Sequence, residues 1–247
     1  MNDGFVNEKD IIEYLNEKKF NQLNINFQKF LKFIFKDYLD ENLSFKAKKC
    51  PGGIKPDIVI SHNGISKYIS IKKGSGNSVH QERIDVFFPY FKSITDEHSL
   101  NNLKKFHYGD DTIDDTGLTR YSASQAKSKY KNEINQLNKI INTDNNLINF
   151  LDRFLFIGNM AETKVDYLYH GTINKGYWAS REEIIRLILG KEFNINGVHF
   201  GPLTYQVWGR NHNRTAKYPD RRYVMQVKWQ SVLDNLKTIR KENDLDI

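Results

Sequence analysis

The chain has 247 residues, with 37 lysines and arginines against 30 aspartates and glutamates, so its formal net charge is +7. Hydrophobic residues make up 39% of the chain and aromatic residues 13%, which excludes intrinsic disorder and suffices for a sizeable core. The single cysteine excludes an intramolecular disulfide and any zinc site built on two thiolates, as expected in a reducing cytosol.

No segment of the sequence is apolar enough to predict a membrane span. The most apolar stretch, from Phe154 to Ala161, has eight residues, whereas a membrane-spanning helix needs roughly 20. The first ten residues carry acids where a signal peptide needs a basic start and an apolar run. We therefore expect one soluble, cytoplasmic domain covering residues 1–247.

The spacing of the apolar residues predicts a mixed α and β fold. Between Asn24 and Asp40, large apolar residues recur every three or four positions, as on the buried face of a helix. A turn is expected at Pro51-Gly52-Gly53, and a strand region begins after it. Further helices are predicted at 130–141, at 147–155 and after a capping box at 180–183, and further strands at 164–170, 198–207 and 222–229.

A β-hairpin is predicted around Asn63-Gly64, because a two-residue type I′ turn needs positive φ at both central residues. Such a turn determines the register, so that His62 lies opposite Ile65 and Asp57 lies opposite Ser70. Alternation places five isoleucines on one face, namely Ile58, Ile60, Ile65, Ile69 and Ile71. On the other face an acid, a hydroxyl and a lysine converge: Asp57, Ser70 and Lys72.

A helix is expected after the hairpin, because Ser78 to Gln81 has the pattern of a capping box. Glu82 would lie in its first turn, close to the end of the strand that carries Lys72. Carboxylates hold Mg²⁺, a hard cation that prefers oxygen ligands, and a lysine ammonium can position the attacking water or the phosphate. Two acids and a lysine around one point are what metal-dependent phosphodiester hydrolysis needs.

Pro56-Asp57 followed by Ser70-Ile71-Lys72 resembles the Pro-Asp and (Asp/Glu)-x-Lys pattern of the PD-(D/E)xK nuclease superfamily, to which most type II restriction endonucleases belong. The resemblance covers about 30 of the 247 residues. It departs from the pattern at Ser70, which stands in the place of the second acid. A subgroup of restriction enzymes is similar in having Ser-x-Lys on the strand and an acid on the following helix, where Glu82 stands.

The resemblance implies a restriction-endonuclease-like core, a central mixed sheet flanked by helices, with the catalytic hairpin and helix at 54–90. Asp57 and Glu82 would ligate Mg²⁺, Lys72 would lie next to the attacking water, and Ser70 would support them. Cutting both strands of a palindrome in double-stranded DNA calls for a homodimer. The nearby residues expected to contact DNA are Lys73, Asn77, His80 and Gln81.

The basic charge is concentrated in a second segment, a strand–loop–strand at 197–229. Between Arg210 and Lys228, six basic residues stand against one acid. Arginine, lysine and asparagine side chains pair with the phosphates and base edges of DNA, and a solvated loop is the alternative. The residues expected to contact DNA here are Arg210, Asn213, Arg214, Lys217, Arg221 and Arg222.

Four aspartates lie in an acidic loop at 110–115, and their spacing does not match an EF-hand. This composition predicts a turn-rich surface loop. The alternatives are a loop that lies against DNA, with Arg120 on the phosphate backbone, or an additional metal site.

Two other functions stay open beside the type II restriction endonuclease. One is a repair or homing nuclease. The other is a catalytically silent DNA-binding protein, which Ser70 at the place of an acid favours. If Glu82 proves dispensable, Glu13 or another acid of the N-terminal helix becomes the candidate for the second acid.

Overall fold

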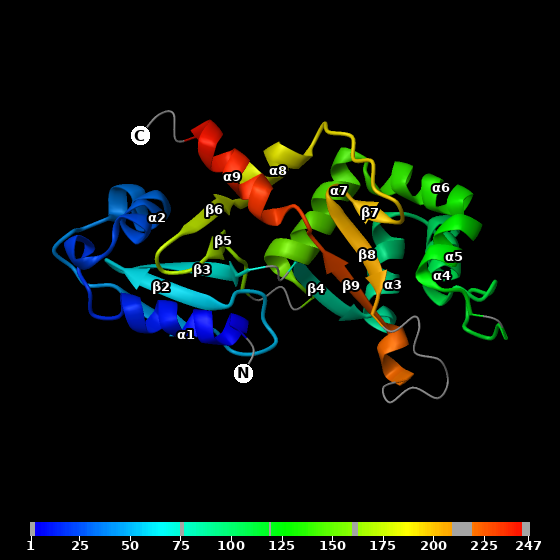
Figure 1. Ribbon diagram of the computed structural model, residues 1–247, viewed down its shortest axis with the longest axis horizontal. Helices are drawn as coiled ribbons and strands as arrows, with labels where there is room; N and C mark the ends of the chain where they lie inside the picture. The colour runs from blue at the N-terminus through cyan, green and yellow to red at the C-terminus, as the bar shows by residue number, and fades with distance from the viewer. Residues whose placement is uncertain (1–2, 75–76, 119, 160–162, 209–218, 244–247) are drawn as a thin grey trace. The chain divides into compact units, whose positions relative to one another are not determined.

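A computed structural model describes residues 3–74, 77–118, 120–159, 163–208 and 219–243. They form a mixed α and β structure, which confirms the predicted fold class (Figure 1). The chain folds into two compact units. The first unit consists of residues 1–77, 155–187 and 231–247, and the second unit of residues 78–154 and 188–230. The expected single domain over residues 1–247 stays a prediction.

The first unit is built on a mixed five-stranded sheet in the order β1-β2-β3-β5-β6. The strands are β1 (Lys46–Lys49), β2 (Ile58–His62), β3 (Ile65–Lys72), β5 (Tyr167–Gly171) and β6 (Gly176–Ser180). The first three form an antiparallel meander, β5 runs parallel to β3, and β6 is antiparallel to β5. The first unit therefore contains the mixed sheet that the sequence analysis expects.

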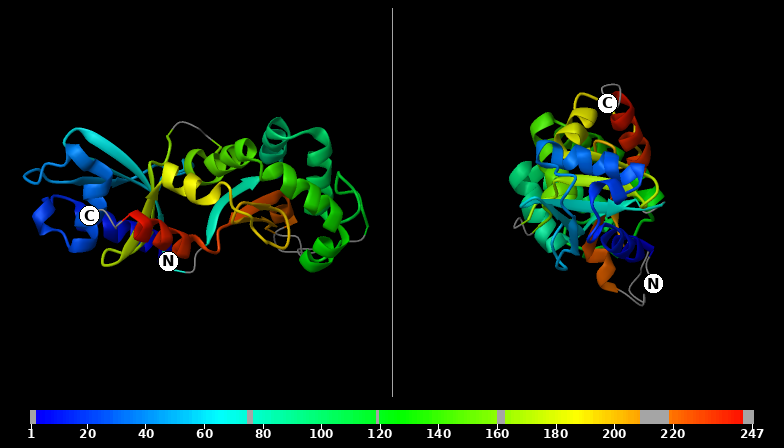
Figure 2. Two further views of the ribbon diagram at one scale, coloured as in Figure 1. Left: turned by 90° about the horizontal axis from the view of Figure 1, so that it is seen from above. Right: turned by 90° about the vertical axis from the view of Figure 1, so that its left-hand side faces the viewer.

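Helices of the first unit cover this sheet and build its core. They are α1 (Asp3–Leu15), η1 (Phe20–Gln22), α2 (Ile25–Phe35), η2 (Lys36–Tyr38), α8 (Arg181–Ile188) and α9 (Val232–Asn243). Buried side chains of α1 and α2, such as Ile11 and Phe30, pack with Ile60 of β2 and Trp178 of β6. The α9 helix lies along β6, as Figure 1 and the two further views of Figure 2 show.

The hairpin of β2 and β3 has the register that the turn predicts. Asn63 and Gly64 both have positive φ, +48° and +75°, and His62 pairs with Ile65. The isoleucines of the hairpin enter the core that α1 and α2 cover: Ile58, Ile60, Ile69 and Ile71 are buried there and Ile65 packs against them. Since the isoleucine face is covered by helices, Asp57, Ser70 and Lys72 alternate to the other side of the strands.

The second unit has an antiparallel four-stranded sheet in the order β4-β9-β8-β7. Its strands are β4 (Ser78–Arg83), β7 (His199–Phe200), β8 (Leu203–Val207) and β9 (Val224–Lys228). Its helices are α3 (Ile84–Ile94), α4 (Glu97–Tyr108), α5 (Ala123–Lys129), α6 (Lys131–Ile141), α7 (Asp144–Leu151) and η4 (Pro219–Tyr223), while a π-helical turn, η3 (Asp152–Ile157), follows α7. The helix predicted at 147–155 is thus an α-helix that continues as a π-helical turn.

The prediction that a helix starts at Ser78 is wrong. Residues Ser78–Arg83 form strand β4, and the following helix α3 begins at Ile84. The reason is that β4 pairs with β9, which lies about 150 residues further along the chain and supplies its backbone hydrogen bonds. The local sequence pattern cannot predict such a distant partner. Among the described residues, none of the helices has the length and apolar content to cross a bilayer.

Candidate active site

Asp57 is held at the start of β2 by groups of β3. Its Oδ2 atom accepts a hydrogen bond of 2.6 Å from the Ile71 backbone N–H and one of 3.1 Å from the Ser70 hydroxyl. Among the described residues, no hydrogen bond reaches its Oδ1 atom. About a quarter of the side chain is exposed. The carboxylate is therefore fixed through one oxygen and has the other oxygen open for a ligand.

Lys72 brings a positive charge to the same carboxylate. Its Nζ atom lies 3.7 Å from Asp57 Oδ2, and about a fifth of the side chain is exposed. That distance is long for a hydrogen bond. Within the described residues the ammonium makes no closer polar contact, so its donors are available to a further group.

Glu8 of α1 is a second acid that interacts electrostatically with Asp57 and Lys72. Its side chain is 10% exposed, and its Oε2 atom lies 3.4 Å from the Nζ atom of Lys49 on β1. Burial and the charge of Asp57 together raise the pKa of the Glu8 carboxyl, although Lys49 and Lys72 act in the opposite direction. Two carboxylates that repel each other in this way are suited to share a cation.

Sequence reasoning allows an acid of the N-terminal helix in this role, but it singles out Glu13 and not Glu8. Glu13 is 64% exposed and pairs with Lys9 at a distance of 3.5 Å on the helix surface. Only the fold distinguishes the two acids, because the choice depends on which face of α1 lies against the sheet. A signal was present in the spacing: Ile11 and Leu15, three and seven positions after Glu8, are among the core residues of α1.

Glu82 belongs to the second unit, where both carboxylate oxygens already accept hydrogen bonds. Arg153 reaches both oxygens, and His80 Nε2 lies 3.0 Å from Oε2. The side chain is only 1% exposed. Burial opposes ionisation of this carboxyl, but the hydrogen bonds from His80 and Arg153 outweigh it, and the pKa is lowered. Its role as a metal ligand stays a prediction.

The other residues expected near the hairpin differ in how far they reach the surface. Gln81 is exposed, and Lys73 and Asn77 are half-buried. His80 is buried at 8% exposure, and it contacts Glu82 and, at a ring distance of 5.3 Å, Phe154. The imidazole of His80 is thus a member of a buried network in the second unit.

Arg210, Asn213, Arg214 and Lys217 of the basic segment lie outside the described residues. Arg221 is half-buried, and its guanidinium lies 4.4 Å from the ring centre of the partly exposed Trp208. Arg222 differs from its neighbour because its side chain is only 8% exposed and forms an ion pair with Asp115. The two adjacent arginines therefore have different surroundings.

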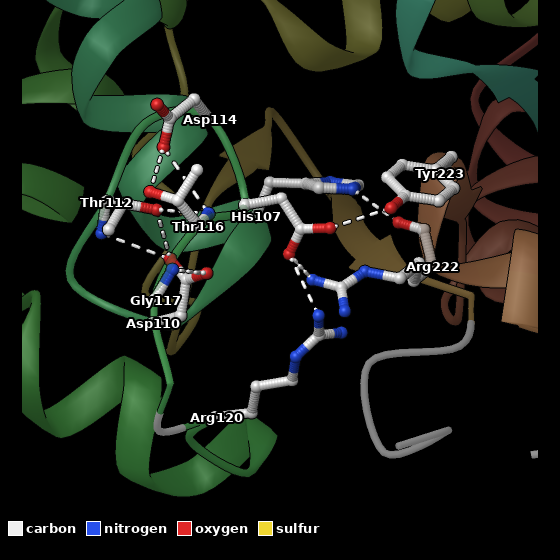
Figure 3. Close-up of polar contacts among 10 residues, drawn as sticks. His107, Asp110, Thr112, Asp114, Thr116, Gly117, Arg120, Arg222 and Tyr223 are labelled. Carbon is white, nitrogen blue, oxygen red and sulfur yellow. Dashed lines mark hydrogen bonds and ion pairs between the residues drawn. The ribbon is translucent and has the colours of Figure 1, made fainter. Parts of the chain in front are cut away.

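The ion pair of Arg222 belongs to a cluster that joins the acidic loop to η4 (Figure 3). Asp115 Oδ1 also lies 3.1 Å from an Arg120 nitrogen, and Asp115 Oδ2 accepts a 2.7 Å hydrogen bond from the Tyr223 hydroxyl. His107, buried in α4, lies 2.7 Å from the Arg222 carbonyl oxygen and 2.6 Å from the Tyr205 hydroxyl. One carboxylate thus balances two of the arginines that the sequence assigns to DNA.

The other aspartates of the acidic loop make bonds within the second unit. Asp110, which is buried, accepts hydrogen bonds from the Thr112 backbone and hydroxyl and from the Gly117 backbone, as Figure 3 shows. Asp114 accepts a 2.7 Å hydrogen bond from Thr116, and Asp111 lies 2.8 Å from Lys129. Within the described residues, no group of three histidine, cysteine or acidic side chains has the arrangement of a metal site. The bonds support the expected turn-rich loop.

Comparison with known proteins adds no relative to this description. No protein-family model matches the chain, and no curated protein matches it either.

Proposed function

We propose that the first unit carries the active site of a Mg²⁺-dependent nuclease that hydrolyses phosphodiester bonds of double-stranded DNA, as a type II restriction endonuclease does. The observation that carries the proposal is the set formed by Asp57, which precedes β2, Glu8 of α1 and Lys72 of β3. Lys72 Nζ lies 3.7 Å from Asp57 Oδ2, and Glu8 interacts electrostatically with both residues. Two acids with a lysine are the residue types that this chemistry requires.

The donor set fits a hard divalent cation. Asp57 Oδ1 and Glu8 Oε1 receive no hydrogen bond from the described residues, and both are carboxylate oxygens, the ligands that Mg²⁺ prefers. Burial and, after it, the charge of Asp57 raise the pKa of Glu8, and a bound cation would favour the ionised form of this carboxyl. When bound, Mg²⁺ would acidify a water molecule and neutralise charge on the phosphate.

Each residue of the site has a separate task in the proposed reaction. Asp57 and Glu8 would hold the cation, and Ser70 donates its hydroxyl hydrogen to Asp57 Oδ2, which leaves Oδ1 without a hydrogen bond from the described residues. Lys72 directs its ammonium toward the attacking water or the phosphate and stabilises the negative charge that develops there. Ser70 therefore supports an acid, and Glu8 supplies the carboxylate that the sequence pattern lacks at position 70.

DNA is the proposed substrate because the chain is basic and its basic segment has the side chains that bind phosphates and bases. The formal charge of +7 favours a polyanion, and the positive residues concentrate between Arg210 and Lys228. Cutting both strands of a palindromic site would require two copies of the active site, so we propose a homodimer as the acting form.

Incubation of plasmid DNA with the protein and Mg²⁺ tests the proposal. We expect discrete fragments from the wild type, and no fragments from Asp57→Asn or when EDTA replaces Mg²⁺. The Asp57→Asn variant should still shift the DNA in a gel, because the substitution leaves the rest of the fold intact.

The outcomes separate the alternatives. A smear instead of discrete bands would indicate a nuclease without sequence specificity, such as a repair enzyme. A gel shift with no cleavage by the wild type in Mg²⁺ or Mn²⁺ would contradict the proposal and indicate a silent DNA-binding protein. Cleavage by Asp57→Asn at the wild-type rate would place the active site elsewhere.

A further inference from the structure

His170 on β5 is a buried imidazole beside Lys72. The residue is 4% exposed, and β5 and β3 pair in parallel with His170 directly across from Lys72. Side chains of directly paired residues project from the same face of a sheet. The imidazole therefore lies on the face that carries the Lys72 side chain.

One ring nitrogen of this imidazole lacks a partner. Nε2 is fully buried and has no hydrogen-bond partner in the described part of the chain. The backbones of Gly74 and of His170 itself act on the ring as hydrogen-bonding groups that raise its pKa, and because Nε2 has no partner this interaction is assigned to Nδ1. Because that interaction favours the protonated ring, the Gly74 carbonyl is the acceptor and Nδ1 carries the hydrogen. Nε2 of the neutral ring is thus a bare acceptor.

The groups around the ring keep it neutral. Burial lowers the pKa of His170, and the positive charges of Lys237 on α9 and Lys72 lower it further. On its other side, His170 pairs with Tyr177 of β6. A buried acceptor without a donor is unfavourable, so a donor is expected at Nε2.

We propose, on the basis of the proposed nuclease function, that His170 is a positioning residue for Lys72: the lysine ammonium donates a hydrogen bond to Nε2, a bond that requires Lys72 to turn from its present arrangement, in which Nε2 has no partner. The ammonium can donate a further hydrogen bond, because the distance from Lys72 Nζ to Asp57 Oδ2, 3.7 Å, is long for a hydrogen bond. A neutral histidine is suited to this task, since it holds the lysine without competing with the phosphate for its charge. An acid in the same place would form a closer ion pair and neutralise the lysine.

The contact can be tested by nuclear magnetic resonance without any measurement of cleavage. With ¹⁵N-labelled histidine, we expect His170 to show the Nδ1–H tautomer. Lys72→Met should raise the pKa of His170 by about one unit or more, because it removes both the hydrogen-bond donor and a positive charge. Lys237→Met, the matched control, removes a charge alone and should raise the pKa by less than Lys72→Met does. An Nε2–H tautomer, or a pKa unchanged in Lys72→Met, would overturn the contact.

Two substitutions then test the role in cleavage. His170→Gln can place an amide oxygen near the position of Nε2 and should keep the rate within about threefold of the wild type. His170→Asn can bond only to the Gly74 carbonyl, and we expect the rate to fall about 10–100-fold at unchanged stability. Equal rates in these two variants would contradict the positioning role. A wild type that shows the tautomer and the Lys72 effect but never cuts DNA would contradict the proposed function and leave the contact standing.

Discussion

Glu8 and Glu82 are both buried glutamates, but their electrostatic surroundings are opposite. Glu8 lies near a second acid, Asp57, and its pKa is raised. Glu82 is enclosed by Arg153 and His80, and its pKa is lowered. A buried carboxylate that destabilises the folded protein is expected at a functional site. A buried carboxylate that accepts hydrogen bonds from two neighbouring residues is expected where it stabilises the fold. This contrast favours Glu8 as the second metal ligand.

The first prediction is that Glu8→Gln stabilises the metal-free protein at neutral pH. A glutamate with a raised pKa in the folded state contributes stability that is present below its ordinary pKa of 4.5 and is lost as the pH rises through the folded value. At pH 7 the substitution should therefore raise the free energy of unfolding, and the gain should vanish at low pH. Urea unfolding at several pH values in EDTA measures this. A loss of stability at pH 7 would contradict it.

Added Mg²⁺ should make the wild type more stable than Glu8→Gln, which is the reverse of the order expected without metal. A ligand that binds only the folded state raises its stability, so millimolar Mg²⁺ should raise the Tm of the wild type. The Tm of Glu8→Gln and of Asp57→Asn should respond much less. Glu13→Gln is the matched control on the same helix, because the Glu13 carboxylate is exposed and, in the described part of the chain, pairs with Lys9. Equal responses in all four proteins would argue against a site at Glu8 and Asp57.

The second prediction is that Glu82→Gln destabilises the fold. The substitution leaves the Arg153 guanidinium, which is 13% exposed, without its carboxylate. Breaking such a pair costs about 3–5 kcal/mol. Because the pKa of Glu82 is lowered, its contribution is present above the ordinary pKa of 4.5 and is lost as the pH falls through the folded value. Unchanged unfolding at pH 7 would instead leave Glu82 available for a metal.

At the scale of elements, the hairpin could be predicted and the segment after it could not. The turn at Asn63-Gly64 requires a local backbone conformation, and the register of β2 and β3 follows from it. Strand β4 has no such local cause, because its hydrogen bonds come from β9. The capping-box pattern at Ser78 is compatible with a helix, but a strand partner distant in sequence decides the outcome.

The third prediction concerns the acidic loop, in which Asp110 and Asp114 provide a matched pair. Asp110 is 4% exposed and accepts three hydrogen bonds, from Thr112 and Gly117. Asp110→Ala should lower the free energy of unfolding by about 1–3 kcal/mol, because buried donors lose their acceptor. Asp114→Ala should change it by less than about 0.5 kcal/mol, since its bonds are exposed. A stabilisation of the wild type by millimolar Ca²⁺ or Mg²⁺ that is lost in Asp114→Ala would indicate a metal site in this loop.

The fourth prediction separates the two adjacent arginines of η4. Arg221→Ala should weaken binding to all DNA sequences alike and reduce the salt slope by about one unit, as expected for a phosphate contact. Arg222→Ala should instead lower the free energy of unfolding by about 3–5 kcal/mol, because it removes one of the positive charges that pair with the largely buried Asp115 carboxylate. Binding isotherms at two salt concentrations and urea unfolding distinguish these effects. A base-specific loss in Arg221→Ala would contradict the assignment.

At the scale of the whole molecule, the fold class and the hairpin register could be predicted from the sequence, and the division of the chain into two compact units could not. Apolar periodicity and turn residues are local, so they predict α2, α6, α8 and the strands around Tyr167 and Met225. Each compact unit is instead assembled from segments that are distant in the sequence, as when 231–247 joins 1–77. For the same reason Asp57, Ser70 and Lys72 could be named together, whereas Glu8 and His170 depend on the packing of α1 and β5.

The central claim is that Glu8 and Asp57 of the first unit form the metal-binding pair of a nuclease. The most direct measurement is the single-turnover rate of plasmid cleavage in Mg²⁺ for the wild type, Glu8→Gln and Glu13→Gln at equal protein concentration. We expect Glu8→Gln to be slower than the wild type by at least about 10²-fold, since one ligand of the cation is lost, with Glu13→Gln unchanged. Wild-type cleavage by Glu8→Gln, with loss of cleavage in Glu82→Gln at retained stability, would contradict the account.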